Sequence, residues 1–440
     1  MLHLATPADD TDQTHATTCG RTATEKNIKI YFRCFTPTST LGACPIVCVD
    51  GGQQANPLVL IAAVVDCDTR GIIVSPRVAA IGAGLFGLSG VVYVLTGVGV
   101  GGEQQVDPSL WIIHLSLLTY VYGMGSLVYQ AKHARVASDF INSFVNVSIL
   151  VLTANNSYWW LTHRDLLRNV LRKANESDNS TIQAGLFVDK HQHSLCMIKR
   201  ILFIFYFINL TNEFTSYLPK RADLNEKTFL MTPCVGLKPL TSSPQREVCI
   251  VLISLQELTI VIVVLNFQTM MLLLIAHTSV MYQLLSDEIM TFNTLLTDPS
   301  NYGLVKQRLG VIIKRHILTL DIVKDIRVLY SIPMGINFGS NAVCMCFFFF
   351  LEPEEYFNFM PISMYCFIVF FLYCFLGQRL TNAAEMFFRA VYSCGWEMMD
   401  IKEQRAISIM LLQSQKDVDL LAADLIPVNM LTFARTSQGI

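Results

Sequence analysis

The chain has 440 residues, of which 52% are apolar and only 15% are charged, and its mean hydropathy is +0.44. Length alone would suit two or three soluble domains, but such domains average about 25% charged residues, and so few charges cannot cover so much apolar surface. A net charge of −2 excludes the basic footprint of a nucleic-acid-binding protein. The composition therefore predicts a membrane protein.

The amino-terminal part differs from the rest of the chain. Residues 1–70 are polar and irregular, and they lack the basic and apolar regions of a secretory signal. We therefore predict a cytosolic, irregular tail over residues 1–75 and a transmembrane helical domain over residues 76–440. The 13 cysteines are scattered without C-x-x-C pairs, which indicates neither a zinc site nor a disulfide framework.

The first apolar segment, residues 78–102, has no charge and is rich in glycine. It contains G-x-G-x-x-G at residues 82–87, which in a dinucleotide-binding protein joins a strand to a helix. No alternating strand and helix pattern follows, and glycines also allow membrane helices to approach closely. We interpret this segment as either membrane-associated or an additional span.

Six later segments are long and apolar enough for helical membrane crossings. They are Leu110–Gln130, Phe140–Leu161, Ile198–Leu218, Val248–Ala276, Ser331–Leu351 and Ile362–Gly377. A seventh, partial helix is expected over residues 406–440. The connectors at 163–173 and 277–330 have helical apolar spacing, so we expect helical extensions outside the membrane. The predicted fold is all-α, a polytopic helical membrane protein.

Lysine and arginine counts predict the orientation, because cytosolic loops carry the excess. Loops 162–200, 277–330 and 379–405 carry 7, 6 and 4 of these residues, together 17. Loops 131–139, 219–247 and 352–361 carry 2, 5 and 0, together 7. The first group is therefore predicted to be cytosolic, which places the amino terminus inside.

Few residues indicate chemistry. Glu257 and Glu213 lie within or near predicted spans, where they could serve an ion pathway or, more simply, accept a hydrogen bond inside the bundle. His191 and His193 could bind a metal, although a solvated loop is the simpler interpretation. The sequence has no P-loop, H-E-x-x-H or G-x-S-x-G motif, so it does not predict an enzyme.

A set of spaced residues near the carboxy terminus is more specific. Gly377 closes an apolar run, Ala390-x-Tyr392-x-x-x-Trp396 follows, and Ser414-Gln415-Lys416 precedes Pro427-x-Asn429-x-x-Thr432-Phe433. This pattern resembles the carboxy-terminal signature of insect odorant receptors. Asp417 and Ala423 depart from it, since proline and glycine are common there. The family also continues beyond Phe433 for longer than this chain does, so we expect a truncated last helix with an incomplete share of the pore.

The resemblance implies an odorant-specific subunit in the plasma membrane. It would form a hetero-oligomer, a tetramer, with the odorant co-receptor, and the assembly would be a cation channel gated by small volatile molecules, without a cofactor. The fold implied is a seven-helix bundle with cytosolic helical extensions. The alternatives are a gustatory receptor of the same superfamily or a seven-helix G-protein-coupled receptor.

The resemblance and the predicted helix directions together suggest site residues. Odorants would bind an apolar pocket in the outer half of the bundle, for which the candidates are Phe140, Phe144, Phe214, Tyr217, Gln256 and Tyr365. The last helix would line the pore or gate with Pro427, Asn429, Leu431 and Phe433. Tyr392 and Trp396, four residues apart, would pack on one helix face as anchors of the cytosolic assembly.

Overall fold

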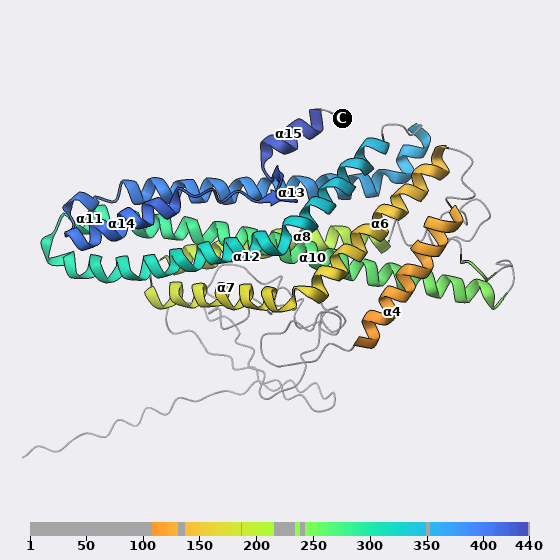
Figure 1. Cartoon of the computed structure of the whole chain (residues 1–440), viewed down its shortest axis with the longest axis horizontal. Coiled ribbons are helices and arrows are strands. Elements are labelled where there is room, and N and C mark those ends of the chain that lie inside the picture. The colour runs from red at the N-terminus through yellow and green to blue at the C-terminus, as the bar shows by residue number, and fades with distance from the viewer. Residues whose placement is uncertain are drawn as a thin grey trace, which may run out of the picture. The chain divides into compact units, whose positions relative to one another are not determined.

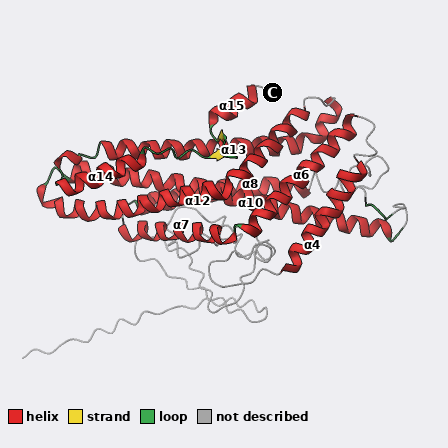
Figure 2. Ribbon diagram, viewed as in Figure 1, coloured by secondary structure: helices red, strands yellow, loops and turns green. Residues whose placement is uncertain are grey.

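Long helices make up nearly all of the described structure, a computed structural model (Figures 1 and 2). It describes residues 108–130, 137–185, 187–214, 234–237, 243–348 and 353–438, all within the compact unit Gly71–Ile440. The predicted tail and the glycine-rich segment 78–102 lie outside these ranges. The prediction of an all-α fold is confirmed.

The first half of the described chain forms five helical elements. They are α4 (Pro108–Leu118), the π-helix η1 (Thr119–Gln130), α6 (Ala137–Thr162), α7 (Arg164–Ala184) and α8 (Val188–Asn212). The second half contains α10 (Gln245–Met290), α11 (Phe292–Leu295), the 3₁₀ turn η4 (Pro299–Asn301), α12 (Tyr302–Phe348), α13 (Pro353–Tyr392), the 3₁₀ turn η5 (Trp396–Met398), α14 (Ile401–Ser414) and α15 (Met430–Gln438).

The helix α10 is the centre of the bundle. It packs against α13, α12, α8 and α6, and Figure 1 shows it extending from one end of the bundle to the other. Every residue from Ile260 to Thr269 is buried. A helix that is apolar on all sides avoids water only when neighbours surround it, which explains this central position.

Three helices are much longer than a membrane is thick. α10, α12 and α13 have 46, 47 and 40 residues, so each is about 60–70 Å long, against a hydrocarbon core of about 30 Å. Their far ends lie together with α11 and α14 at one end of the bundle (Figure 1). The predicted helical nature of segments 163–173 and 277–330 is therefore confirmed in α7, α10 and α12.

Length and apolar composition mark three candidate membrane spans among the described residues. They are Val188–Asn212, Gln245–Leu295 and Ile362–Met398. The first two contain much of the predicted spans 198–218 and 248–276, and the third contains 362–377. The spans proposed over 110–130, 140–161 and 331–351 coincide with helical segments, but their passage through a membrane stays a prediction.

The carboxy-terminal stretch is interrupted, so the prediction of one partial helix over 406–440 is wrong. α14 ends at Ser414, and β1 (Leu421–Ala422) then pairs antiparallel with β2 (Ile426–Pro427) before α15 begins. The Val428 amide donates to the Leu420 carbonyl at 2.9 Å, and Ala423 donates to the Ser331 carbonyl of α12 at 2.7 Å. Bonds between these distant segments replace the local bonds that a helix would need.

Tyr392 and Trp396 are not on one helix face, which corrects the predicted geometry. α13 ends at Tyr392, and Gly395 takes a left-handed conformation (φ 69°) that turns the chain before Trp396. Tyr392 is 64% exposed, and the Trp396 indole donates to its carbonyl at 3.1 Å. Within one chain these rings are thus not a buried anchor, while their role in an assembly stays a prediction.

A disulfide joins Cys234 to Cys249, which corrects the expectation of no disulfide. Both cysteines are buried, and Ile253 packs with them one helical turn further along α10. The bond therefore ties the segment 234–237 to the start of α10, at the end of the bundle opposite α14. Sequence spacing could not reveal it, because pairing depends on the approach of the two backbones.

Candidate functional site

An apolar cluster surrounds α10 at the end of the bundle that carries the disulfide. Its buried members are Leu118, Val121, Tyr122, Leu152, Ile260 and Val264. Tyr365 of α13 packs against this cluster and is itself partly buried. Five helical elements, α4, η1, α6, α10 and α13, therefore contribute to one apolar environment. Such an environment binds small apolar molecules by burial at about 25 cal/mol per Å².

Glu257 brings a carboxylate into this region, and a tyrosine satisfies it. The Tyr122 hydroxyl donates to Glu257 Oε1, and the two residues are 0% and 2% exposed. This contact supports the hydrogen-bonded interpretation of Glu257 over an ion pathway. Tyr122 was not predicted, because it lies in a π-helix, a form that apolar spacing does not indicate and that often occurs at functional sites.

Gln256 has a buried side-chain amide whose hydrogen-bonding groups are not satisfied by the described residues. Its side chain is 0% exposed, and neither Oε1 nor Nε2 has a hydrogen-bond partner among the described residues. Since residues four apart share a helix face, Gln256 lies on the face that carries Ile260 and Val264 of the cluster. Leaving a buried amide unpaired costs about 1–3 kcal/mol, so a bound polar atom at this position would be stabilised.

Tyr365 of α13 contacts a second buried glutamine of α10, Gln268. Its hydroxyl donates to Gln268 Oε1 at 2.8 Å, while Gln268 Nε2 has no partner in the part of the chain that the structure describes. Of the predicted ligand candidates, Tyr365 therefore packs against the apolar cluster, and Gln256 lies on the helix face that carries two of its members. Gln268 was not among the predicted residues, although a second buried glutamine on α10 could have indicated it.

The remaining aromatic candidates are less well supported. Phe144 is half-buried on α6, and Phe214 is 49% exposed beyond the end of α8. Phe140 lies in α6, but its side chain is outside the description, as is all of Tyr217. An exposed position suits contact with lipid as well as it suits contact with a ligand, so Phe214 is the weakest candidate of the set.

The predicted pore residues lie beside α13. Pro427 is exposed in β2, and Leu431 is 55% exposed on α15. Asn429 caps α15, since its Oδ1 accepts a hydrogen bond from the Thr432 amide at 2.9 Å. Phe433 packs against three α13 rings at centroid distances of 5.4–5.5 Å, those of Phe367, Phe370 and Phe371. Their role in ion passage stays a prediction.

Gly377, part of the signature, makes a close backbone approach possible. A Cβ at this position would collide with the Val428 carbonyl. Gly335 of α12 plays the same part, because a Cβ there would lie 2.6 Å from the Ala423 Cβ. The hairpin between α14 and α15 is thus held directly against two helices, and Asp424 accepts a hydrogen bond from the Ser331 hydroxyl at 2.6 Å.

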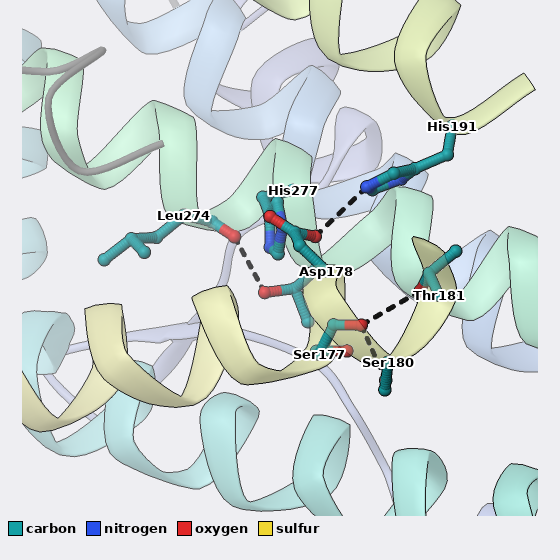
Figure 3. A network of polar contacts seen from close by, with 8 residues as sticks. Ser177, Asp178, Ser180, Thr181, His191, Leu274 and His277 are labelled. Carbon is teal, nitrogen blue, oxygen red and sulfur yellow. Dashed lines mark hydrogen bonds and ion pairs between the residues drawn. The ribbon is translucent and has the colours of Figure 1, made fainter. Parts of the chain in front are cut away.

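The opposite half of the bundle contains buried charges that are paired. Figure 3 shows Asp178 of α7 between His191 of α8 and His277 of α10. Its Oδ1 lies 2.9 Å from His277 Nε2 and 3.2 Å from His191 Nε2. Burial alone raises the pKa of Asp178, but the charges and hydrogen bonds of the two histidines outweigh it and hold that pKa well below its usual range.

This network also corrects the interpretation of the histidine pair. His191 is 1% exposed on the first turn of α8 and not part of a solvated loop. Among the described residues, no group of three metal-ligating side chains could hold a metal ion. Together, the three side chains connect α7, α8 and α10, which is a structural role.

Comparison with known proteins identifies the family. A family model described as 7tm Odorant receptor matches residues 138–440, well over half of the chain. The chain belongs to this odorant receptor family. The family is one of multi-pass membrane proteins, and the match to it sets the gustatory and G-protein-coupled alternatives aside.

The relatives agree with this assignment. Odorant receptor 10a of Drosophila melanogaster is 24% identical over 177 residues, which are 37% of this chain and 43% of that receptor. Odorant receptor 67a of the same species is 25% identical over 133 residues, which are 29% of this chain and 33% of that receptor. These alignments span less than half the length of the curated relatives.

Solved structures show the same fold. The olfactory receptor OR5 of Machilis hrabei in complex with eugenol has a TM-score of 0.62 at 14% identity, covering 88% of this chain and 97% of that one. The structure of the same receptor described without eugenol has a TM-score of 0.60, also at 14% identity, covering 82% and 94%. The helical architecture of this odorant receptor therefore matches an insect olfactory receptor over most of its length.

Proposed function

We propose that this odorant receptor is the odorant-specific subunit of a ligand-gated cation channel, which it forms with the odorant co-receptor in the plasma membrane. A small volatile molecule binds at the apolar cluster around Gln256 and Tyr365. The family supports the receptor role. The buried amide of Gln256, which has no partner among the described residues, is the observation that supports this location. Burial of the odorant supplies affinity, and the amide fixes the orientation of an oxygen-bearing group.

Gating follows from preferential binding. A ligand shifts an equilibrium only by its difference in affinity between two states. α13 carries Tyr365 near the cluster and, further along, the aromatic rings that contact Phe433 of α15. One rigid helix therefore joins the proposed odorant site to the predicted pore residues, and a small displacement of α13 would reach both.

The test is odorant-evoked current from the chain co-expressed with the co-receptor. Gln256→Met conserves volume but removes the amide, and a net hydrogen bond contributes about 0.5–1.5 kcal/mol, or roughly twofold to tenfold in affinity. We expect that loss for alcohols, aldehydes and ketones and little change for hydrocarbons. Gln378→Met, at a glutamine that bonds Asn382 on the surface of α13, is the matched control. Equal effects on both odorant classes would contradict this site.

The proposal includes the orientation of the chain in the membrane. The charge split of 17 to 7 supports a cytosolic amino terminus, and the disulfide of Cys234 lies in a loop that this orientation places outside. An epitope tag before Met1 should be stained only after permeabilisation of the cells. Staining of intact cells would reverse the proposed topology.

A further inference from the structure

A cleft of about 750 Å³ lies among α7, α10 and α12, in the half of the bundle that is predicted to be cytosolic. Its charged and hydroxyl-bearing lining comprises Glu176 and Ser180 of α7, Glu288 of α10, and Arg308, Lys314, Arg315 and Asp321 of α12. Glu288 follows Gln256 by 32 residues on α10, which is about 48 Å along the helix. The cleft is thus separate from the proposed odorant site, and its volume is typical of small-molecule pockets.

Arg315 lines this cleft and has unused, buried hydrogen-bond donors. Its side chain is only 4% exposed, and its Nη1 lies 2.5 Å from Glu288 Oε2. Nε and Nη2 have no hydrogen-bond partner among the described residues. These two nitrogens form one edge of the planar guanidinium, whose parallel N–H groups match two oxygens of a single oxyanion. Because buried donors are almost always paired, this edge indicates a missing partner.

The charges around Arg315 favour an anion with more than one negative charge. Glu176 lies 3.9 Å from Arg172, so a cation outside the cleft stands beside this acidic residue of its lining. Asp321 lies 3.9 Å from Lys173, which is shared with Asp325 at 2.7 Å. In the described ranges, neither Arg308 nor Lys314 has an ion-pair partner. The cleft therefore has two basic side chains in the same lining as Arg315, although the charge of Arg308 also acts on Glu288.

The position of Arg315 along α12 favours a water-soluble anion over a lipid headgroup. The predicted span begins at Ser331, 16 residues after Arg315, so along a helix perpendicular to the membrane the guanidinium lies about 24 Å from the hydrocarbon. The headgroup layer extends only roughly 5–8 Å beyond the hydrocarbon on each side. A phosphate that is still attached to a membrane lipid would not reach this depth of the cytosolic half.

We propose that this cleft binds a small, soluble, phosphate-bearing molecule with several negative charges. One phosphate lies on the Nε and Nη2 edge of Arg315, and further phosphates lie near Arg308 and Lys314. The ligand thereby bridges α7 and α12 on the cytosolic side. This site is independent of odorant binding, so either proposal can fail without the other.

The test uses inositol trisphosphate as the probe and the purified full-length chain, with binding measured by calorimetry at low salt. Arg315→Lys keeps the charge beside Glu288 but removes the two-pronged edge, so we expect affinity to fall about tenfold or more. Lys314→Gln should weaken binding about threefold, and added salt should weaken it further. Lys324→Gln, at an exposed lysine of α12 outside the cleft, is the matched control and should leave affinity unchanged.

Three outcomes would overturn the proposal. They are no binding of inositol trisphosphate to the native chain, equal effects of Lys314→Gln and Lys324→Gln, and binding only to vesicles that contain phosphatidylinositol bisphosphate. The last outcome would assign the phosphate chemistry to lipid. If Arg315→Lys lowers the unfolding temperature, its loss of binding could come from unfolding. Arg308→Gln is then the deciding variant, because Arg308 has no ion-pair partner in the described ranges, and unchanged affinity in it would contradict the proposal.

Discussion

Buried polar side chains have different kinds of partner in the two halves of this odorant receptor. In the half beyond the predicted spans, Asp178 meets two histidines and Glu288 meets Arg315, all of them nearly inaccessible to solvent. In the half around the apolar cluster, the polar contacts are single hydrogen bonds, such as that of Tyr365 with Gln268, and Gln256 has none that is described. One half has buried pairs of charged side chains that join different helices, whereas the polar contacts described in the other half are single hydrogen bonds.

This difference suggests that one half fixes the arrangement of the helices and that the other binds the ligand. A charge that loses its partner in a buried site is strongly destabilising, so paired charges specify a single arrangement of helices. An unpaired neutral amide costs less and can be compensated by a ligand. We therefore expect substitutions in the first half to affect folding and assembly, and substitutions near Gln256 to affect odorant response.

The largest expected effect comes from breaking the buried pair between Glu288 and Arg315. Glu288→Leu should destabilise the protein by about 3–5 kcal/mol, because Arg315 would keep a buried charge without its partner. The double variant Glu288→Leu with Arg315→Met should recover most of this loss, since an apolar pair needs no compensation. Thermal unfolding in detergent measures both.

The control for this pair is a salt bridge on the surface. Asp165 lies 3.5 Å from Arg168, but its side chain is 96% exposed, so Asp165→Ala should change stability by less than about 1 kcal/mol. A similar loss in Asp165→Ala and Glu288→Leu would remove the distinction between the buried and exposed charges.

Lowering the pH should destabilise the protein through His316, a buried histidine in the same half as the charge pairs. Burial lowers its pKa from 6.5 to about 4 in the folded protein, where it packs against Phe387 and Tyr282. The unfolded state therefore binds the proton more readily, and stability falls as the pH drops from 6.5 towards 4. Between pH 7 and pH 5 this contribution amounts to roughly 2 kcal/mol.

Comparison with the variant His316→Phe isolates this effect, because the contributions of all other groups cancel in the difference. The unfolding temperature of the native chain should fall more steeply between pH 7 and pH 5 than that of the variant. Parallel pH curves would mean that His316 is accessible to protons in the folded state.

Gly377→Ala tests the link between α13 and the carboxy-terminal hairpin. The added Cβ would collide with the Val428 carbonyl, and such overpacking costs about 1–3 kcal/mol. We expect faster proteolysis between residues 415 and 429. Gly339→Ala on α12, where a Cβ would meet nothing within 4 Å, should instead be neutral or slightly stabilising. Equal protection of both variants would contradict the close approach.

Trp396→Ala should have the smallest effect on the isolated chain. Its ring is only half-buried, so the loss should be well below the roughly 3–5 kcal/mol of a fully buried tryptophan. Co-precipitation with the co-receptor measures the predicted role in assembly, and Met398→Ala, at a residue that is 74% exposed, is the control. Unchanged co-precipitation in both variants would remove Trp396 from the proposed interface.

The sequence by itself determined the membrane class, the helical fold and the family. Long apolar runs leave the backbone no alternative to a helix in lipid, and residues such as Gly377 and Trp396 carry the family signature in their spacing. It also suggested Gln256 and Tyr365 as site candidates, because a polar or aromatic residue within an apolar run is conspicuous, and their role in binding stays a prediction.

Only the tertiary structure decided which groups meet. Asp178 and His277 are 99 residues apart in the chain, Cys234 pairs with Cys249, and Ala423 donates to Ser331 across 92 residues in place of a continuous helix. These contacts depend on how α7, α10 and α12 pack, and local propensity contains no information about such long-range pairing. The free edge of Arg315 has the same origin, since its neighbours come from other helices.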